Sequence, residues 1–321
     1  MFIENIKRKK IVWLIFIGLI IGEWDLSLGK DIKEQAKTVF LYQLSYFQKL
    51  DSLEYTSTLT MQDAELADIP YSDVFFVLKG DKYYRKVVMK GTKGEEKGLM
   101  INSFNGESYQ YLYKMGIEQK GILIFSSNPL RDDTASYDVL LELYSFVYAP
   151  NEIPRFATLK EKTTWERLVD GVAAYSEAEM FGHKGVKLTL QKPKVKIGEG
   201  DAAYYQGETY EVFFASEFTY FPLYIYRRIQ VSPIGESQWA PTEISEELKV
   251  TEVKSIESTV FPLKIERISK DKNGELIGKT IFKIDTKSLK INKSVDEKVF
   301  TIPRTGVGMI VNEDTGEVIR E

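Results

Sequence analysis

The stretch Ser258–Pro303, STVFPLKIERISKDKNGELIGKTIFKIDTKSLKINKSVDEKVFTIP, shows the pattern that decides the fold. Apolar and polar side chains alternate over Phe261–Glu266, the period of two that is typical of a strand with one buried face. Asn273-Gly274 predicts a two-residue hairpin turn, because this dipeptide tolerates positive φ angles. Leu276–Ile284 is then predicted as the returning strand, and Lys298–Ile302 as a third strand.

The tripeptide Phe-Pro-Leu occurs at Phe261–Leu263 and also upstream, at Phe221–Leu223. Proline has no N–H to donate within a sheet, so Pro262 is predicted at a sheet edge or at the start of a strand. Turn signals between other apolar runs predict further hairpins, at Gly80-Asp81, Asn105-Gly106 and Gly182–Gly185. Together these runs predict about ten or eleven strands in one antiparallel sheet.

Three segments have helical rather than strand periodicity. Lys30–Leu50 has one apolar stripe, and Thr163–Val169 is predicted as a short helix. Tyr137–Tyr148 is apolar almost all round, which predicts burial on every side, with Thr134 or Ser136 as its N-cap. The predicted fold class is therefore α+β: a single large, strongly curved antiparallel sheet wrapped around two or three helices.

Composition narrows the class of function. The 321 residues are 43% hydrophobic, enough for a sizeable core, and carry a net charge of -4. This charge offers no electrostatic basis for binding nucleic acid. The chain has no cysteine, which excludes disulfides, thiolate metal sites and cysteine nucleophiles.

Residues 1–29 have the order of an export signal. Lys7–Lys10 is basic, Ile11–Gly22 is apolar but short for a membrane span, and Ser27–Gly29 offers small residues for cleavage. We expect export with cleavage near Gly29, the alternative being an uncleaved membrane anchor. Residues 30–321 are then predicted to form one domain, in which Lys192–Gly200 is the weak candidate for an internal boundary.

No constellation of residues predicts catalysis. His183 is the single histidine and lies in the predicted turn Gly182–Gly185, so a catalytic triad or a histidine-based zinc site would have to use it. Asp271–Glu275 resembles a calcium loop only in part, and Asn273-Gly274 already explains it as a turn. No carboxylate pair has a spacing that singles it out, so an exported hydrolase is the least favoured class. We predict no enzyme activity, no cofactor and no metal site.

The all-apolar helix Tyr137–Tyr148 and the aromatic strands provide more apolar surface than one sheet face needs. This surplus predicts either a well-filled core or an apolar cavity between the curved sheet and the helices. The candidate ligand-binding residues of such a cavity are Val39, Phe40, Phe47, Leu140, Leu143, Tyr144 and Val147.

Four features in order resemble the LolA/LolB-like superfamily of periplasmic lipoprotein carriers. They are the export signal followed by the helix Ile32–Leu50, the strand-turn-strand Glu179–Leu188, the Leu-Pro-like strand Phe261–Ile265, and the closing segment Leu289–Pro303. The resemblance implies an open half-barrel of about eleven strands, lined with apolar residues that hold acyl chains, and a periplasmic location.

Two functions from different classes follow. The first is an exported, non-enzymatic carrier or binder of lipid or lipoprotein acyl chains, with membrane-associated transfer partners and a role in lipoprotein sorting. The second is a periplasmic sensor or scaffold of the same fold, with the cavity filled by its own side chains. The sequence does not give the ligand or the oligomeric state.

Overall fold

The computed structural model describes residues 31–62, 69–91, 93–116, 119–128, 138–148, 152, 154–198, 203–233 and 242–320. The predicted export signal, residues 1–29, lies outside the described residues. The predicted helix caps Thr134 and Ser136 lie outside them too.

All the described strands belong to one sheet of 16 strands. They are β1 (Ser52–Gln62), β2 (Ile69–Lys79), β3 (Lys82–Lys90), β4 (Glu96–Phe104), β5 (Tyr109–Met115), β6 (Gly121–Ser126), β7 (Val172–Met180), β8 (His183–Ile197), β9 (Tyr204–Ala215), β10 (Phe221–Pro233), β11 (Thr242–Ile256), β12 (Thr259–Lys270), β13 (Leu276–Ile284), β14 (Lys290–Ile291), β15 (Val307–Asn312) and β16 (Glu317–Arg320). The order is β16-β15-β6-β5-β4-β3-β2-β1-β13-β12-β11-β10-β9-β8-β7, with β14 paired to β1. Because β16 and β7 are both edges, the sheet is open.

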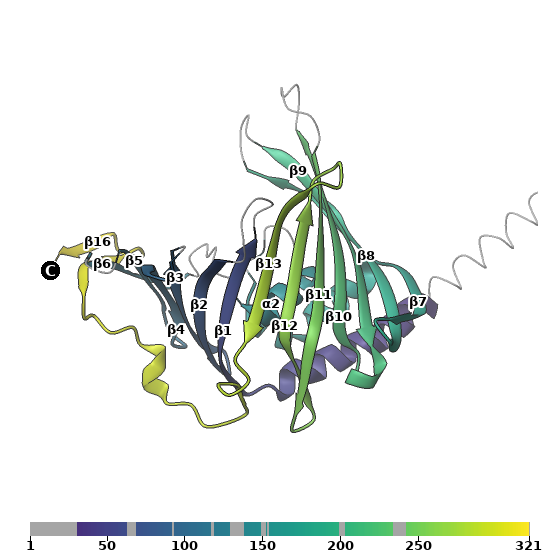
Figure 1. Cartoon of the computed structure of the whole chain (residues 1–321), viewed down its shortest axis with the longest axis horizontal. Helices are drawn as coiled ribbons and strands as arrows, with labels where there is room; N and C mark the ends of the chain where they lie inside the picture. The colour runs from purple at the N-terminus through teal and green to yellow at the C-terminus, as the bar shows by residue number, and fades with distance from the viewer. Residues whose placement is uncertain are drawn as a thin grey trace, which may run out of the picture.

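The sheet curves strongly, and helices lie against its β7–β13 half (Figure 1). The fold class is thus α+β, with an open half-barrel as predicted. The described helices are the leading helix (31–49), α2 (Val139–Leu143), the 3-10 turn η2 (Ser145–Val147), α3 (Phe156–Lys160) and α4 (Lys162–Asp170); two further 3-10 turns are η4 (Ser216–Phe218) and η5 (Glu297–Phe300).

The main core fills the space between these helices and the sheet. The ring centroids of Phe47 on the leading helix and Tyr144 after α2 are 4.7 Å apart in an edge-to-face pair. Trp165 on α4 stacks on Phe47 from 6.2 Å. Phe221 at the start of β10 lies 6.4 Å from Tyr144. Trp165 is buried, and so is the apolar stripe of the leading helix.

A second core lies on the other face of the β2–β6 half. Phe76 and Leu78 of β2 belong to the main core, whereas Val77 between them packs in the second. The two cores receive alternate residues because successive side chains of a strand point to opposite faces of the sheet. The segment 295–302, which we call the strap, covers Val77 with Phe300 and Ile302. It passes below the sheet on its way to β15 (Figure 1).

Two predictions from the opening stretch are wrong. Lys298–Ile302 is not a strand: η5 occupies Glu297–Phe300, because the Asp296 side chain accepts from the Lys298 N–H and starts a helical turn. The turn at Asn273-Gly274 is a five-residue loop rather than a two-residue one, since Lys270 pairs directly with Leu276. The Asp271 carboxylate organises this loop by accepting from two of its backbone N–H groups.

The predicted helix Tyr137–Tyr148 is shorter and broken. α2 ends at Leu143, Tyr144 leaves the helical conformation, and η2 follows. Asp138 caps α2 by accepting from the N–H groups of Leu140 and Leu141, at 3.0 and 2.9 Å. The predicted burial on every side is confirmed for the apolar residues of this segment.

Other differences arise from pairing that local sequence does not encode. The sheet has 16 described strands rather than ten or eleven, and it is mixed, because β15 runs parallel to β6. The hairpin tip before β8 is Phe181-Gly182, so His183 begins the strand. Within the weak boundary candidate Lys192–Gly200, β8 continues to Ile197 and pairs there with β9.

The prediction for Pro262 is confirmed. It lies in the first part of β12, where the strand pairs with β11 alone: Pro262 faces Val253, and pairing with β13 begins only at Lys264. The side of the strand that faces away from β11 therefore needs no N–H at this position.

Candidate functional site

The seven predicted ligand-binding residues come together in the main core. Each has a relative exposure of 2% or less. They are Val39, Phe40 and Phe47 on the leading helix, Leu140 and Leu143 on α2, and Tyr144 and Val147 after it. The structure thus brings the seven residues together as packed side chains of one core.

Polar contacts fix this packing as well. The Tyr144 hydroxyl donates to Oε1 of Gln43 at 2.8 Å, and Nε2 of Gln43 donates to the Tyr220 carbonyl at 2.6 Å. Both polar atoms of the buried Gln43 amide are thereby satisfied. The leading helix, α2 and the start of β10 are therefore joined through one buried amide.

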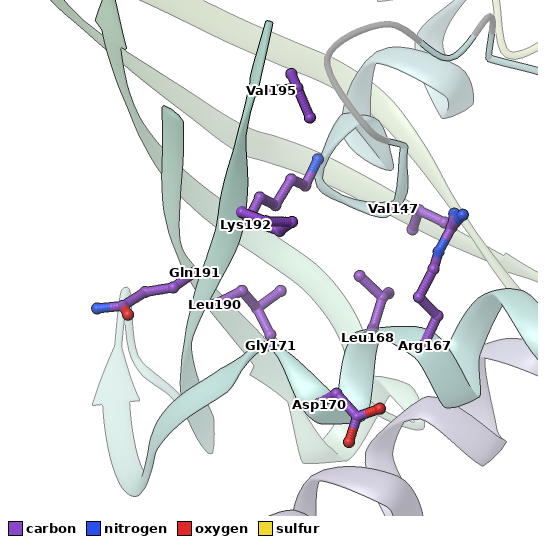
Figure 2. Close-up of a pocket in the computed structure, with 10 residues that line it drawn as sticks. Val147, Arg167, Leu168, Asp170, Gly171, Leu190, Gln191, Lys192 and Val195 are labelled. Carbon is purple, nitrogen blue, oxygen red and sulfur yellow. The ribbon is translucent and has the colours of Figure 1, made fainter. Parts of the chain in front are cut away.

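An apolar pocket of about 540 Å³ lies beside this core, between α4, η2 and β8 (Figure 2). Val147 is the one predicted site residue that lines it. The remaining lining residues are Arg167, Leu168, Asp170, Gly171, Leu190, Gln191, Lys192, Pro193 and Val195. In Figure 2, Leu190 and Leu168 point into the space between β8 and α4, while Gln191 points away.

The strand register explains why a pocket forms here. β7 pairs with β8 as far as Leu190, and beyond it the register of β8 continues with β9 alone. The chain passes from α4 through Gly171 into β7 and so enters the sheet here. A Cβ on Gly171 would lie 2.9 Å from the Gln191 carbonyl oxygen, so the close approach of the two segments requires glycine.

Charged groups surround the pocket. Arg167 forms two bonds to the Glu152 carboxylate, at 2.7 and 3.1 Å, and Asp170 pairs with Lys33 at 3.4 Å. Arg167 also lines a neighbouring, more polar pocket of about 570 Å³.

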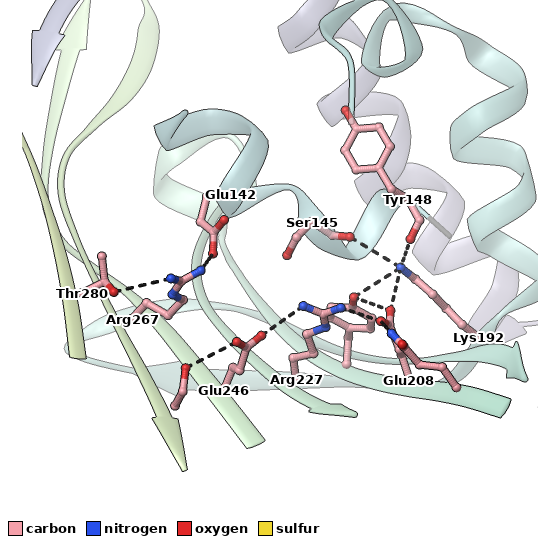
Figure 3. A network of polar contacts seen from close by, with 12 residues as sticks. Glu142, Ser145, Tyr148, Lys192, Glu208, Arg227, Glu246, Arg267 and Thr280 are labelled. Carbon is pink, nitrogen blue, oxygen red and sulfur yellow. Dashed lines mark hydrogen bonds and ion pairs between the residues drawn. The ribbon is translucent and has the colours of Figure 1, made fainter. Parts of the chain in front are cut away.

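A polar network extends from Lys192 across the inner face of the sheet (Figure 3). The Lys192 ammonium is 3.4 Å from Glu208 on β9 and also contacts the Tyr148 carbonyl. Arg227 on β10 joins Glu208 to Glu246 on β11, the second contact being 3.0 Å long.

The network continues towards α2 on the next strand. Arg267 on β12 pairs with Glu142 of α2 at 2.6 Å. The Tyr210 hydroxyl donates to Glu208 at 2.7 Å. With Lys192, Arg227 and Arg267 against three carboxylates, the formal charges balance.

Burial shifts the ionisation of these groups. It lowers the pKa of Lys192 to about 8, outweighing the attraction of Glu208. Burial also acts to raise the pKa of Glu208, but two cations, Arg227 and Lys192, hold it below its usual value. Burial raises the pKa of Glu142 despite Arg267. Lys192 is thus the network member whose proton is most easily lost near neutral pH.

The sequence analysis missed this network. Its signal is present: Glu208 and Tyr210 stand at the inward positions of β9 that Val212 and Phe214 continue, and all four are buried. A carboxylate in such a period-two apolar series predicts a buried cationic partner. The identity of this cationic partner depends on how the strands pair, and the register of pairing cannot be read from the sequence.

His183, the single histidine of the sequence, was the candidate for a metal ligand or a catalytic base. Its Nδ1 contacts the Glu217 carboxylate at the surface. Within the described ranges, no group of three or more His, Asp or Glu side chains is placed to hold a metal ion. No helix in that part of the chain is long and apolar enough to cross a membrane.

No protein-family model matches the chain, and no curated protein matches it. Solved structures similar to it include a DUF1329 family protein from Desulfovibrio piger, with 7% identity, a TM-score of 0.44, and coverage of 84% of this chain and 96% of that one. An outer membrane lipoprotein-sorting protein domain described from Vibrio parahaemolyticus has 9% identity, a TM-score of 0.40, and coverage of 84% and 97%.

A LolA superfamily protein from Nitrosomonas europaea has 11% identity, a TM-score of 0.36, and coverage of 81% of this chain and 96% of that one. This name and the lipoprotein-sorting one agree with the resemblance noted from the sequence. Identities and TM-scores this low carry no functional argument. The open α+β half-barrel is established by the sheet and helices of the chain itself.

Proposed function

We propose that the chain is an exported, non-enzymatic binder of acyl chains, which it holds in the pocket between α4, η2 and β8. The observation that carries the proposal is the pocket itself. Its volume of about 540 Å³ is in the range of small-molecule sites, and five of its ten lining side chains are apolar: Val147, Leu168, Leu190, Pro193 and Val195.

The energy of binding would come from hydrocarbon burial. Each methylene removed from water contributes about 0.8 kcal/mol, so a single chain can bind without a dedicated polar motif. Arg167 lies between the apolar pocket and its polar neighbour and is paired with Glu152, so in the proposal a carboxylate or phosphate head group would replace the Glu152 carboxylate there.

The predicted ligand-binding residues lie in the main core beside the pocket, so the proposal includes them. Val147 lines the pocket, and the other six residues, Val39, Phe40, Phe47, Leu140, Leu143 and Tyr144, pack in the same core. In the proposal they receive the distal part of a longer chain after α2 and η2 shift. Lipoprotein cargo, membrane-associated transfer partners and a periplasmic location belong to the same proposal.

A titration with a fluorescent fatty acid tests the pocket. Val195 is half-buried at the pocket wall, so Val195→Trp should fill the space and weaken binding about tenfold or more. Lys196 is exposed and points to the other face of β8, which makes Lys196→Trp the matched control. Equal affinities of both variants and the delipidated wild type would place the ligand elsewhere.

Export is tested separately, by N-terminal sequencing of the protein recovered from the periplasmic fraction. Cleavage near Gly29 is the expected outcome. An intact Met1 on a membrane-bound product would identify the segment as an anchor.

A second candidate function, a sensor or scaffold, is favoured by one observation: the seven predicted residues are 0 to 2% exposed and already fill the interior. A native mass spectrum of protein from a membrane-containing lysate separates the two. Bound lipid supports the carrier, and a lipid-free mass together with no saturable fatty-acid binding supports the scaffold.

A further inference from the structure

Three tight turns lie side by side at one end of the sheet. They connect β7 to β8, β9 to β10 and β11 to β12, which are consecutive antiparallel neighbours. Among the described residues, six that are not glycine have positive φ, and five of these form the three turns: Phe181, Thr219, Tyr220, Glu257 and Ser258.

Two of these residues are aromatic, which is unusual in this conformation. Phe181 has φ 56° and Tyr220 has φ 60°. Left-handed turn positions favour Gly, Asn and Asp, and a bulky side chain there is strained. The Phe181 side chain remains 46% exposed, so burial in the core does not account for its presence. Strained and exposed residues of this kind point to an external contact.

The aromatic residues continue onto the leading helix. The rings of Tyr42 and Tyr220 are 5.1 Å apart, and Phe218, in η4 beside the same turn, lies 5.2 Å from the His183 ring. Tyr42 and its neighbour Leu41 are 43% and 48% exposed. We call Leu41, Tyr42, Phe181, Phe218 and Tyr220 the turn rim.

Lysines accompany the turn rim. The Lys249 ammonium lies 4.0 Å from the centroid of the Phe181 ring. Lys184 and Lys254 are exposed next to the turns. Within the part of the chain that the structure describes, none of these three lysines has a carboxylate within 4.0 Å. Of the carboxylates nearby, Glu217 is engaged with His183 and Glu257 with Lys293, while Glu179, opposite Lys184 in the β7–β8 hairpin, is exposed.

We propose that the turn rim is a docking surface for an anionic lipid bilayer. Phe and Leu supply apolar side chains, Tyr supplies rings with a polar end, and lysine stems reach past them to the head groups. This combination is typical of side chains at a membrane–water interface.

Environment-sensitive labels test the proposal, because the chain has no cysteine and each substitution creates a unique attachment point. In the full chain, Phe181→Cys and Tyr220→Cys carry the label at the rim. Lys272→Cys carries it in the exposed β12–β13 loop at the opposite end of the sheet. The probe is a phosphatidylcholine vesicle with or without phosphatidylserine, containing nitroxide-labelled lipid.

Labels at 181 and 220 should be quenched by nitroxide lipid, more so with phosphatidylserine, while the label at 272 should not. The apolar segment Ile11–Gly22 can bring the chain to a vesicle by itself, so the contrast between the two ends is the readout. Equal quenching at all three positions, or no quenching at the rim, overturns the proposal and leaves the turn rim as a surface for a protein partner.

Two sets of variants give a quantitative check. Asn suits positive φ, so the double variant Phe181→Asn, Tyr220→Asn should fold with an unchanged or higher melting temperature. Its vesicle affinity should fall by roughly 3- to 10-fold per side chain. Lys254→Gln should lower affinity for anionic vesicles about 5-fold, and the matched control Lys272→Gln should not. Unchanged affinity in the double variant or in Lys254→Gln contradicts the assignment.

Discussion

Lys192 connects the apolar pocket to the buried network, and its proton is coupled to folding. Its ammonium lies between the carbonyl groups of Ser145 and Tyr148 and the Glu208 carboxylate. Burial lowers the pKa of Lys192 from 10.5 to about 8. The folded chain therefore binds fewer protons than the unfolded chain between these two values, and the free energy of unfolding rises with pH in this window.

This linkage predicts a measurable pH dependence. Between about pH 8 and pH 9.5 the titration of Lys192 should increase the free energy of unfolding of the wild type by about 1.5 kcal/mol relative to Lys192→Met, in which the buried tyrosines titrate in the same way. Lys192→Met should abolish the increase, because it removes the titrating group and keeps the apolar stem. Urea unfolding across this range is the measurement. A wild-type slope equal to that of the variant would show that Lys192 keeps its usual pKa.

Glu208 has a predicted role in stability. Its side chain is 1% exposed and neutralises both Lys192 and Arg227. Glu208→Gln leaves two buried cations with Glu246 as the one remaining carboxylate of this group, and should cost about 3 to 5 kcal/mol. Glu211, on the same strand, pairs with Lys187 in a largely exposed bridge, so Glu211→Gln should cost less than about 1 kcal/mol. Similar costs in chemical denaturation would contradict the buried network.

Residue-level sequence reasoning succeeded where periodicity alone decides burial. Phe47 and Leu143 were predicted to face inward, and both have 0% exposure. It could not give the partners of a buried charge. Lys192 and Glu208 meet because β8 and β9 pair in one register, and Arg267 reaches Glu142 across 125 residues of chain.

The strap packs on the second core, a role that its sequence pattern did not predict. Phe300 and Ile302 are buried against β2–β6, on the face opposite the main core. Phe300→Ala should therefore destabilise the fold by about 3 to 5 kcal/mol. Val299 beside it is half-buried, and Val299→Ala should cost less than Phe300→Ala. Thermal unfolding of the two variants gives the comparison, and equal small losses would show that the strap is dispensable.

The sequence predicted strands correctly where a short turn joins two strands that are consecutive in the chain. Gly80-Asp81 separates β2 from β3, and Asn105-Gly106 separates β4 from β5, as expected. η5 was missed because a capping hydrogen bond from the Lys298 N–H to the Asp296 carboxylate overrides an alternating pattern. The parallel pairing of β15 with β6 was missed because it joins segments nearly two hundred positions apart.

At the scale of the molecule, the open sheet has two consequences. Its concave side holds the main core, and the pocket forms where α4 leads into β7 and the pairing of β7 with β8 begins. An apolar pocket at an open edge can admit a ligand without unfolding the core. The central claim is that this pocket binds an acyl chain through hydrocarbon burial.

The most direct test is a chain-length series of saturated fatty acids, measured by displacement of a fluorescent analogue from the delipidated protein. Burial at about 0.8 kcal/mol per methylene predicts that affinity increases about fourfold with each added carbon until the pocket is full. Val195→Trp should shorten the length at which affinity stops rising. Affinity independent of chain length, or no saturable binding, would contradict the account.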